Sequence, residues 1–131
     1  MKIYVADDSL MLRQQLIAML SGLSGIEIVG QAQDAREAAQ AIRALKPDVV
    51  TLDIRLIGGS GIDVLRKIKQ EDRALVVIML TNSTALPFRR RCMEAGADFF
   101  LDKSTEFRKV REIVQGLLEQ FNTPEAEALS G

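Results

Sequence analysis

Five short apolar runs are separated by segments whose apolar residues recur every three or four positions. The runs are 2–6 (KIYVA), 26–32 (IEIVGQA), 48–52 (DVVTL), 75–80 (LVVIML) and 98–101 (DFFL). Apolar runs of this length are typical of strands buried on both faces, and the intervening periodicity is typical of helices. The alternation predicts an α/β fold, with a five-stranded parallel sheet, helices on both faces and right-handed crossovers.

Capping and stop signals support the predicted helices. Ser9 and Asp34 precede two of them as N-cap residues, and Glu37 completes a capping box with Asp34. Pro87 is placed near the start of the fourth helix, and Gly96 is expected to end it. A fifth helix follows the last strand and runs to about residue 121. Five strands are therefore predicted to alternate with five helices.

The length of 131 residues fits one domain of ordinary size. We predict a folded domain over residues 1–121 and a flexible C-terminal tail over residues 122–131, whose sequence (NTPEAEALSG) is poor in core residues. Seventeen basic and eighteen acidic side chains give a formal charge of -1. That balance argues against direct binding to nucleic acid, so any function based on charge must be local.

Composition narrows the available chemistry. The chain has no histidine, which removes imidazole bases and the usual zinc ligands, and its single cysteine, Cys92, has no intrachain disulfide partner. No apolar run approaches the roughly 18 to 20 residues that span a bilayer, and no signal peptide precedes the first run. We therefore expect a cytoplasmic protein without membrane association, whose chemistry uses carboxylates, hydroxyls and lysine.

Polar residues follow four of the predicted strands where each strand ends. Asp7 and Asp8 follow the first strand, Asp53 the third, Thr81 the fourth and Lys103 the fifth. In an open parallel sheet these ends share one edge, where ligands collect. Neighbouring carboxylates repel unless a cation compensates, and Mg²⁺ suits a shallow oxygen site that also receives phosphate. A carboxylate beside Mg²⁺, a lysine and a hydroxyl is equipped to become an aspartyl phosphate.

These residues resemble the receiver domains of two-component response regulators, including the single-domain chemotaxis type. The resemblance also rests on Gly61, eight residues after Asp53, and on the segment AGAD (95–98). It covers about residues 1–120. It implies a doubly wound (βα)₅ fold with flavodoxin-like strand order 2-1-3-4-5, an order that comes from the resemblance alone.

The resemblance also implies roles for the acidic residues. Asp53 would accept a phosphoryl group from a phosphohistidine on a sensor histidine kinase or a histidine phosphotransfer protein. Asp8 would bind Mg²⁺ directly and Asp7 mainly through water. The metal ligands would be completed by Asp53 and the backbone carbonyl of Arg55. The protein would then be a phosphoacceptor regulator and not an enzyme, with at most slow self-dephosphorylation.

Switching residues are implied in the same way. Lys103 would pair with the phosphoryl oxygens, and Thr81 would hydrogen-bond to the phosphoryl group and draw its loop inward. Phe100 would be the aromatic residue that rotates inward in response. A downstream protein target would bind by contact to the face of the fourth helix, fifth strand and fifth helix. The chain would be a monomer or a phosphorylation-dependent dimer.

Two substitutions affect the loops around the expected site. Ser104 stands where a proline usually follows the lysine, which leaves open whether the Lys103–Ser104 bond is cis; a cis bond before a non-proline residue costs roughly 2.5 to 4 kcal/mol. Ile57 replaces a common proline in the loop after Asp53, so we expect that loop to be more mobile.

A third substitution lies beside the expected pocket. Asn82 stands where the family usually has a small residue, and its amide either obstructs the pocket or hydrogen-bonds to the phosphoryl group. Our hypothesis is that Asn82 and Ser83, with the long side chain of Arg55, set the lifetime of the phosphorylated state.

Other readings remain open at this stage. Each strand-end aspartate is by itself explained as a helix cap or turn former. The basic run 89–91 is either a solvated helix face or a docking site for an acidic partner. Two alternative functions are a docking module of the same fold that works without phosphorylation and, with less support, a Mg²⁺-dependent aspartyl-phosphate phosphatase.

Overall fold

The computed structural model describes residues 1–122, and its main feature is a five-stranded parallel sheet. The strands are β1 (Lys2–Ala6), β2 (Glu27–Ala32), β3 (Val49–Leu52), β6 (Val76–Thr81) and β7 (Phe99–Asp102). Their spatial order is β2-β1-β3-β6-β7, with parallel pairing throughout. Counted along the chain within this sheet, that order is 2-1-3-4-5, so the expected doubly wound, flavodoxin-like fold is confirmed.

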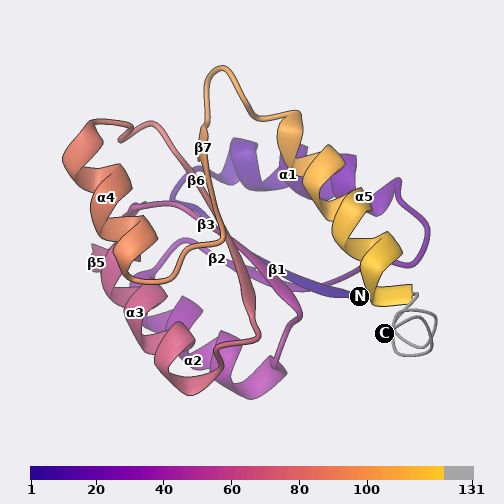
Figure 1. Cartoon of the computed structure of the whole chain (residues 1–131), viewed down its shortest axis with the longest axis horizontal. Coiled ribbons are helices and arrows are strands. Elements are labelled where there is room, and N and C mark those ends of the chain that lie inside the picture. The colour runs from indigo at the N-terminus through magenta and orange to yellow at the C-terminus, as the bar shows by residue number, and fades with distance from the viewer. Residues whose placement is uncertain (123–131) are drawn as a thin grey trace, which may run out of the picture.

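Five helices cover the two faces of the sheet. They are α1 (Leu10–Ser21), α2 (Ala35–Leu45), α3 (Gly61–Glu71), α4 (Leu86–Glu94) and α5 (Lys109–Asn122). Figure 1 shows α1 and α5 together on one side of the sheet and α2, α3 and α4 on the other. Within residues 1–122, no helix is both long and apolar enough to cross a membrane. The expected tail lies outside the described residues, except for Asn122, which is the last residue of α5.

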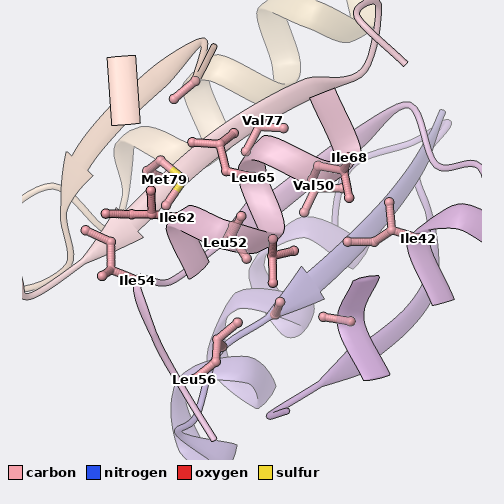
Figure 2. Packing of buried hydrophobic residues seen from close by; sticks show 14 of the residues in the cluster. Ile42, Val50, Leu52, Ile54, Leu56, Ile62, Leu65, Ile68, Val77 and Met79 are labelled. Atoms are coloured by element: carbon pink, nitrogen blue, oxygen red, sulfur yellow. The ribbon is translucent and has the colours of Figure 1, made fainter. Parts of the chain in front are cut away.

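The core consists of two apolar clusters, one on each face of the sheet. The larger cluster includes Ile42 of α2 and Leu65 of α3 and is called the α2–α3 cluster; the other includes Leu16 of α1 and Val114 of α5 and is called the α1–α5 cluster. Strand side chains alternate between them, so that in β3 Val50 faces the α2–α3 cluster while Val49 faces the α1–α5 cluster. Figure 2 shows the larger cluster, in which Ile62, Leu65 and Ile68 of α3 pack against the sheet. Cys92 is fully buried in the same cluster. The sheet is thus buried on both faces, as the continuous apolar runs predict.

The predicted caps form at the helix ends. Ser9 Oγ accepts a hydrogen bond from the Leu12 N–H at 3.2 Å, and Asp34 Oδ1 accepts one from the Glu37 N–H at 2.9 Å. Gly96 follows α4 with φ +101°, a conformation that L side chains rarely adopt. Phe107 precedes α5 and packs against the α1–α5 cluster from the loop. The apolar pattern of the sequence places Phe107 in the fifth helix, but the helix begins at Lys109, because Phe107 fits that pattern through core packing.

A small hairpin in the loop after β3 was not predicted. It pairs β4 (Arg55–Leu56) with β5 (Gly59–Ser60) in antiparallel register. Between them, the Ile57 N–H donates to Gln33 O at 2.9 Å and the Ala35 N–H donates to Ile57 O at 2.9 Å. A proline at position 57 lacks the first of these donors. Greater mobility of this loop stays a prediction, and both hydrogen bonds act against it.

Candidate functional site

Three of the predicted site residues make direct ionic contact at the C-terminal edge of the sheet. Lys103 Nζ lies 2.8 Å from Asp7 Oδ2 and 2.8 Å from Asp53 Oδ2. Asp7 is 2% exposed and Asp53 is 3% exposed. Water therefore screens these charges poorly, and each interaction is stronger than the same contact on an open surface.

Asp8 completes a group of three carboxylates. One carboxylate oxygen from each of Asp7, Asp8 and Asp53 lies within 4.8 Å of the other two. Asp8 is exposed while the other two side chains are buried, so the group opens to solvent on one side. Hard oxygen donors beside an open side are the arrangement that suits Mg²⁺, which keeps several of its waters. The residues present therefore fit a magnesium ion.

Burial and pairing shift the pKa values of Asp7 and Lys103. Burial raises the pKa of Asp7 to about 6, although hydrogen bonds from Lys103 and from the Ser9 N–H oppose the change. Burial alone would lower the pKa of Lys103, but its hydrogen bonds to Asp53 and Asp7 outweigh that effect and raise the pKa above its usual value. The lysine is therefore held as a cation against the carboxylates.

Backbone hydrogen bonds place the two buried aspartates one residue beyond their strands. The Asp7 N–H donates to Ala32 O at 3.0 Å, and the Asp53 N–H donates to Ala6 O at 3.0 Å. The parallel ladder thus continues past Ala6 and brings both carboxylates to the same edge. Asp7 Oδ1 also accepts a hydrogen bond from the Ser9 N–H at 2.8 Å, which fixes the carboxylate orientation.

Gly61 packs directly under the main chain of Asp53. Its N–H donates to Ile54 O at 2.7 Å, and a Cβ atom built on it would lie 1.8 Å from the backbone oxygen of Asp53. Only glycine fits such a close approach. The glycine eight residues after the aspartate therefore has a steric role in setting where Asp53 lies.

A cavity of about 320 Å³ opens beside Asp53. Its lining residues are Asp8, Asp53, Arg55, Thr81, Asn82, Ser83 and Lys103. Thr81 is fully buried, and its Oγ1 accepts a hydrogen bond from the Ser83 N–H at 3.0 Å. The structure thus brings the predicted phosphoacceptor, lysine and threonine to one opening. Asn82 and Arg55 are exposed on its rim, and their effect on lifetime stays a prediction.

Phe100 lies away from this cavity, on the α4 side of the sheet. Phe100 belongs to the α2–α3 cluster and Phe99 packs against the α1–α5 cluster, which confirms the opposite orientation expected for adjacent strand residues. Phe100 is 8% exposed, and the guanidinium carbon of Arg89 lies 5.5 Å from its ring centroid. Arg89 is itself exposed, so this cation–π contact connects the basic run of α4 with the predicted switch residue.

Arg13, a buried arginine that contacts the main chain of Asp7, was not predicted from the sequence. Arg13 is 7% exposed; its Nη1 donates to the backbone oxygen of Asp7 at 2.6 Å, and its Nε donates to Gln31 Oε1 at 2.9 Å. A signal was present, because Arg13 precedes the buried residues Leu16 and Leu20 at helical spacing. A basic residue on the apolar stripe of a helix indicates a buried polar contact.

Residues 1–122 contain no cis peptide bond, so the open question about Lys103–Ser104 is answered: this bond is trans. Lys103 nevertheless reaches both Asp7 and Asp53. The serine in place of proline is thus compatible with the position of the lysine.

Comparison with known proteins agrees with this geometry. The family model described as the response regulator receiver domain matches residues 3–115. The response regulator GacA of Pseudomonas aeruginosa is 32% identical over 120 residues, which cover 92% of this chain and 55% of GacA. A protein-glutamate methylesterase/protein-glutamine glutaminase of Methanospirillum hungatei is 40% identical over 115 residues, or 86% of this chain and 33% of that protein. The chain thus spans about half or less of the length of these relatives.

A solved structure supports the same assignment. A chain in the crystal structure of the CheX–CheY–BeF₃–Mg²⁺ complex from Borrelia burgdorferi is 27% identical, with a TM-score of 0.74 over 86% of this chain and 88% of that chain. The family model covers most of the chain, and the five-stranded sheet with its acidic edge has the architecture that the resemblance implies. The chain therefore belongs to the response regulator receiver domain family, whose members act as regulatory phosphoacceptors in two-component signalling.

Proposed function

We propose that this chain is a switch that is phosphorylated on Asp53 with the help of Mg²⁺. The carrying observation is the Lys103 ammonium, held 2.8 Å from both Asp7 Oδ2 and Asp53 Oδ2 beside an open cavity. Asp8 and Thr81, two further strand-end residues expected around a phosphoacceptor, line the same cavity. A lone aspartate that only capped a helix would need none of these neighbours.

The transfer follows from the residues around Asp53. A phosphohistidine of a sensor histidine kinase or phosphotransfer protein presents its phosphoryl group at the cavity. An oxygen of the Asp53 carboxylate attacks phosphorus, and the P–N bond breaks with its electron pair leaving on the imidazole nitrogen. Lys103 meets the charge on the phosphoryl oxygens, and the Thr81 hydroxyl donates a hydrogen bond to one of them.

Mg²⁺ would be held by Asp7, Asp8 and Asp53, together with the backbone carbonyl of Arg55. When bound, it supplies positive charge that reduces repulsion between the aspartates and an incoming phosphoryl group. The donor set supports this assignment, because the three carboxylates lie close together and Asp8 is open to solvent. The Borrelia burgdorferi complex, which contains Mg²⁺ and BeF₃, supports it by analogy.

The output of the switch is a change in partner affinity on the face formed by α4, β7 and α5. When Thr81 turns toward the phosphoryl group, it gives up its contact with the Ser83 N–H, so the loop before α4 shifts. The Phe100 side chain, which lies against Arg89, rotates inward. A cytoplasmic protein target then binds the altered face with a different affinity. Asn82, Ser83 and Arg55 on the cavity rim set the lifetime of the phosphorylated state.

Intact-mass spectrometry after incubation with acetyl phosphate tests this function. The wild type is expected to gain one phosphoryl group only when Mg²⁺ is present, and Asp53→Asn is expected to gain none. Asp63→Asn is the matched control, because Asp63 is an exposed aspartate on α3 away from the cavity. If the wild type and Asp53→Asn are modified equally, Asp53 is not the acceptor. If no protein is modified by acetyl phosphate or by a phosphorylated histidine kinase, the phosphorylation-independent docking module is favoured.

A further inference from the structure

Lys103 carries a long, flexible side chain into the site from the end of β7. Its side chain is 11% exposed, and its ammonium is shared between Asp7 and Asp53. Fixing a lysine side chain costs rotamer entropy, so the ammonium stays in place only if its main chain starts from a fixed point. The segment around Lys103 therefore affects how precisely the ammonium is placed to pair with the oxygens of a phosphoryl group.

Three consecutive backbone N–H groups around Lys103 are all paired. The Asp102 N–H donates to Glu106 Oε1 at 3.0 Å, and the Lys103 N–H donates to Thr81 O at 2.9 Å. The Ser104 N–H donates to Asp102 Oδ1 at 2.9 Å. Two of these three acceptors are side chains of the loop itself, so the main chain is fixed on both sides of Lys103.

Further contacts close the same loop. Ser104 Oγ donates to Asp102 Oδ1 at 2.7 Å, and the Glu106 N–H donates to Asp102 O at 2.8 Å. Lys109 Nζ lies 2.8 Å from Glu106 Oε2 and holds that carboxylate toward the loop. The hydrogen bonds from Ser104 lower the pKa of Asp102 below its usual value, so this carboxylate is an ionised acceptor at neutral pH. We call the side chains of Asp102, Ser104 and Glu106 the 102–106 brace.

We propose that the 102–106 brace positions Lys103, holding its ammonium in the site across the trans Lys103–Ser104 bond. The inference rests on the proposed function, because it concerns the lysine that meets the phosphoryl group. The brace residues are positioning residues, since their hydrogen bonds are made within the loop and none of them lines the cavity.

A brace of this kind has an effect that general stabilisation does not have. The Lys103 ammonium contacts two of the carboxylates that would bind Mg²⁺, Asp7 and Asp53, at 2.8 Å each. A firmly held ammonium therefore repels the metal ion and attracts the phosphoryl group. Loosening the brace should strengthen Mg²⁺ binding while it slows phosphorylation, whereas simple damage to the site should weaken both.

The test compares Asp102→Ala with Asp102→Asn, whose amide oxygen can still accept both hydrogen bonds from Ser104. Isothermal titration calorimetry gives the Mg²⁺ dissociation constant, and intact-mass time courses with acetyl phosphate give the phosphorylation rate. We expect Asp102→Ala to lower the phosphorylation rate about tenfold, because small misplacements of a reacting group have effects of this size or larger. We expect its Mg²⁺ dissociation constant to fall about threefold, because a unit charge is moved away from the carboxylates.

Comparison with other variants calibrates the result. Lys103→Met should give the largest change in both quantities, Asp102→Asn should remain close to wild type, and the remote Asp63→Ala should match wild type. Ser104→Ala removes only the hydroxyl donor of an exposed residue. If circular dichroism shows that Asp102→Ala is unfolded, Ser104→Ala serves as the test of the brace instead.

Two results would contradict the proposal that the 102–106 brace positions Lys103. One is that folded Asp102→Ala and Ser104→Ala keep wild-type values of both quantities. The other is that Mg²⁺ binding and phosphorylation weaken together, which indicates general damage. If the wild type itself takes up no phosphoryl group, the proposed function fails, and the direction of the change in Mg²⁺ affinity alone decides the brace.

Discussion

At the residue scale, two positions near the acidic edge affect stability in different ways, one through steric exclusion and one through an unpaired buried hydroxyl. Gly61 has no room for a side chain against the main chain of Asp53. Thr51, two residues before Asp53, is fully buried, and within residues 1–122 its Oγ1 has no hydrogen-bond partner. The first position constrains the site sterically, and the second places an unpaired polar atom in an apolar setting.

Gly61→Ala is expected to damage both stability and phosphorylation. The new methyl group would meet Asp53 O at 1.8 Å, so the main chain of Asp53 must move. We expect the free energy of unfolding in urea to fall by about 3 kcal/mol, the upper end for overpacking. Gly116→Ala is the matched control, because Gly116 lies inside α5 and, apart from the adjoining backbone of the helix, nothing lies within 4 Å of its Cβ position. That change should stabilise the protein by about 0.5–1 kcal/mol. Equal effects of the two substitutions would contradict the steric role of Gly61.

Thr51→Val is expected to stabilise the protein. The substitution replaces an unpaired buried hydroxyl with a methyl group of similar shape, between Val5 and Ile78 on the neighbouring strands. We expect the free energy of unfolding to rise by about 1 kcal/mol, because the desolvation cost of the hydroxyl disappears. Urea unfolding followed by far-UV circular dichroism measures the change. Thr81→Val should have the opposite sign, since the Thr81 hydroxyl accepts a hydrogen bond from the Ser83 N–H. A loss of stability in Thr51→Val would show that its hydroxyl is paired in solution.

At the element scale, local sequence signals predicted the main strands and helices well. The cap residues Ser9 and Asp34 form the bonds that their positions suggest, and the five apolar runs become the five strands of the main sheet. The short β4–β5 hairpin was missed because its strands are two residues each and carry no alternating apolar pattern. Its geometry depends on contacts with Gln33 and Ala35, which are distant in the sequence.

In the candidate site, too, some residues were predictable from the sequence and others were not. Asp7, Asp53 and Lys103 were predictable because strand ends in a parallel sheet share one edge. The side-chain brace around Lys103 and the buried contact of Arg13 were not predicted, because each depends on rotamers and on hydrogen bonds across the fold. Sequence patterns thus predicted the charged residues at the sheet edge, while the side chains that contact their main chain became visible only in the structure.

At the scale of the whole molecule, folding itself assembles the acidic group that we propose as the Mg²⁺ site. Asp8 and Asp53 are far apart along the chain, and the parallel sheet brings their carboxylates within 4.8 Å. The unfolded chain therefore lacks the site, and an ion that binds only the native state stabilises that state. Net charge is close to neutral overall, so a stabilising effect of Mg²⁺ must come from this local acidic group and not from general screening.

We expect Mg²⁺ to raise the free energy of unfolding of the wild type, by about 2.7 kcal/mol when its concentration is a hundred times the dissociation constant. Asp8→Asn should remove most of this increase, because Asp8 is one of the three carboxylates of the site. Without Mg²⁺, Asp8→Asn should be as stable as wild type or more stable, since Asp8 is exposed and its charge repels its neighbours. Urea unfolding at constant ionic strength, with and without Mg²⁺, measures all four values. Asp63→Asn, which removes an exposed carboxylate from α3, should keep the full increase. An equal Mg²⁺ effect in Asp8→Asn and wild type would place the ion elsewhere and remove the acidic edge from the proposed mechanism.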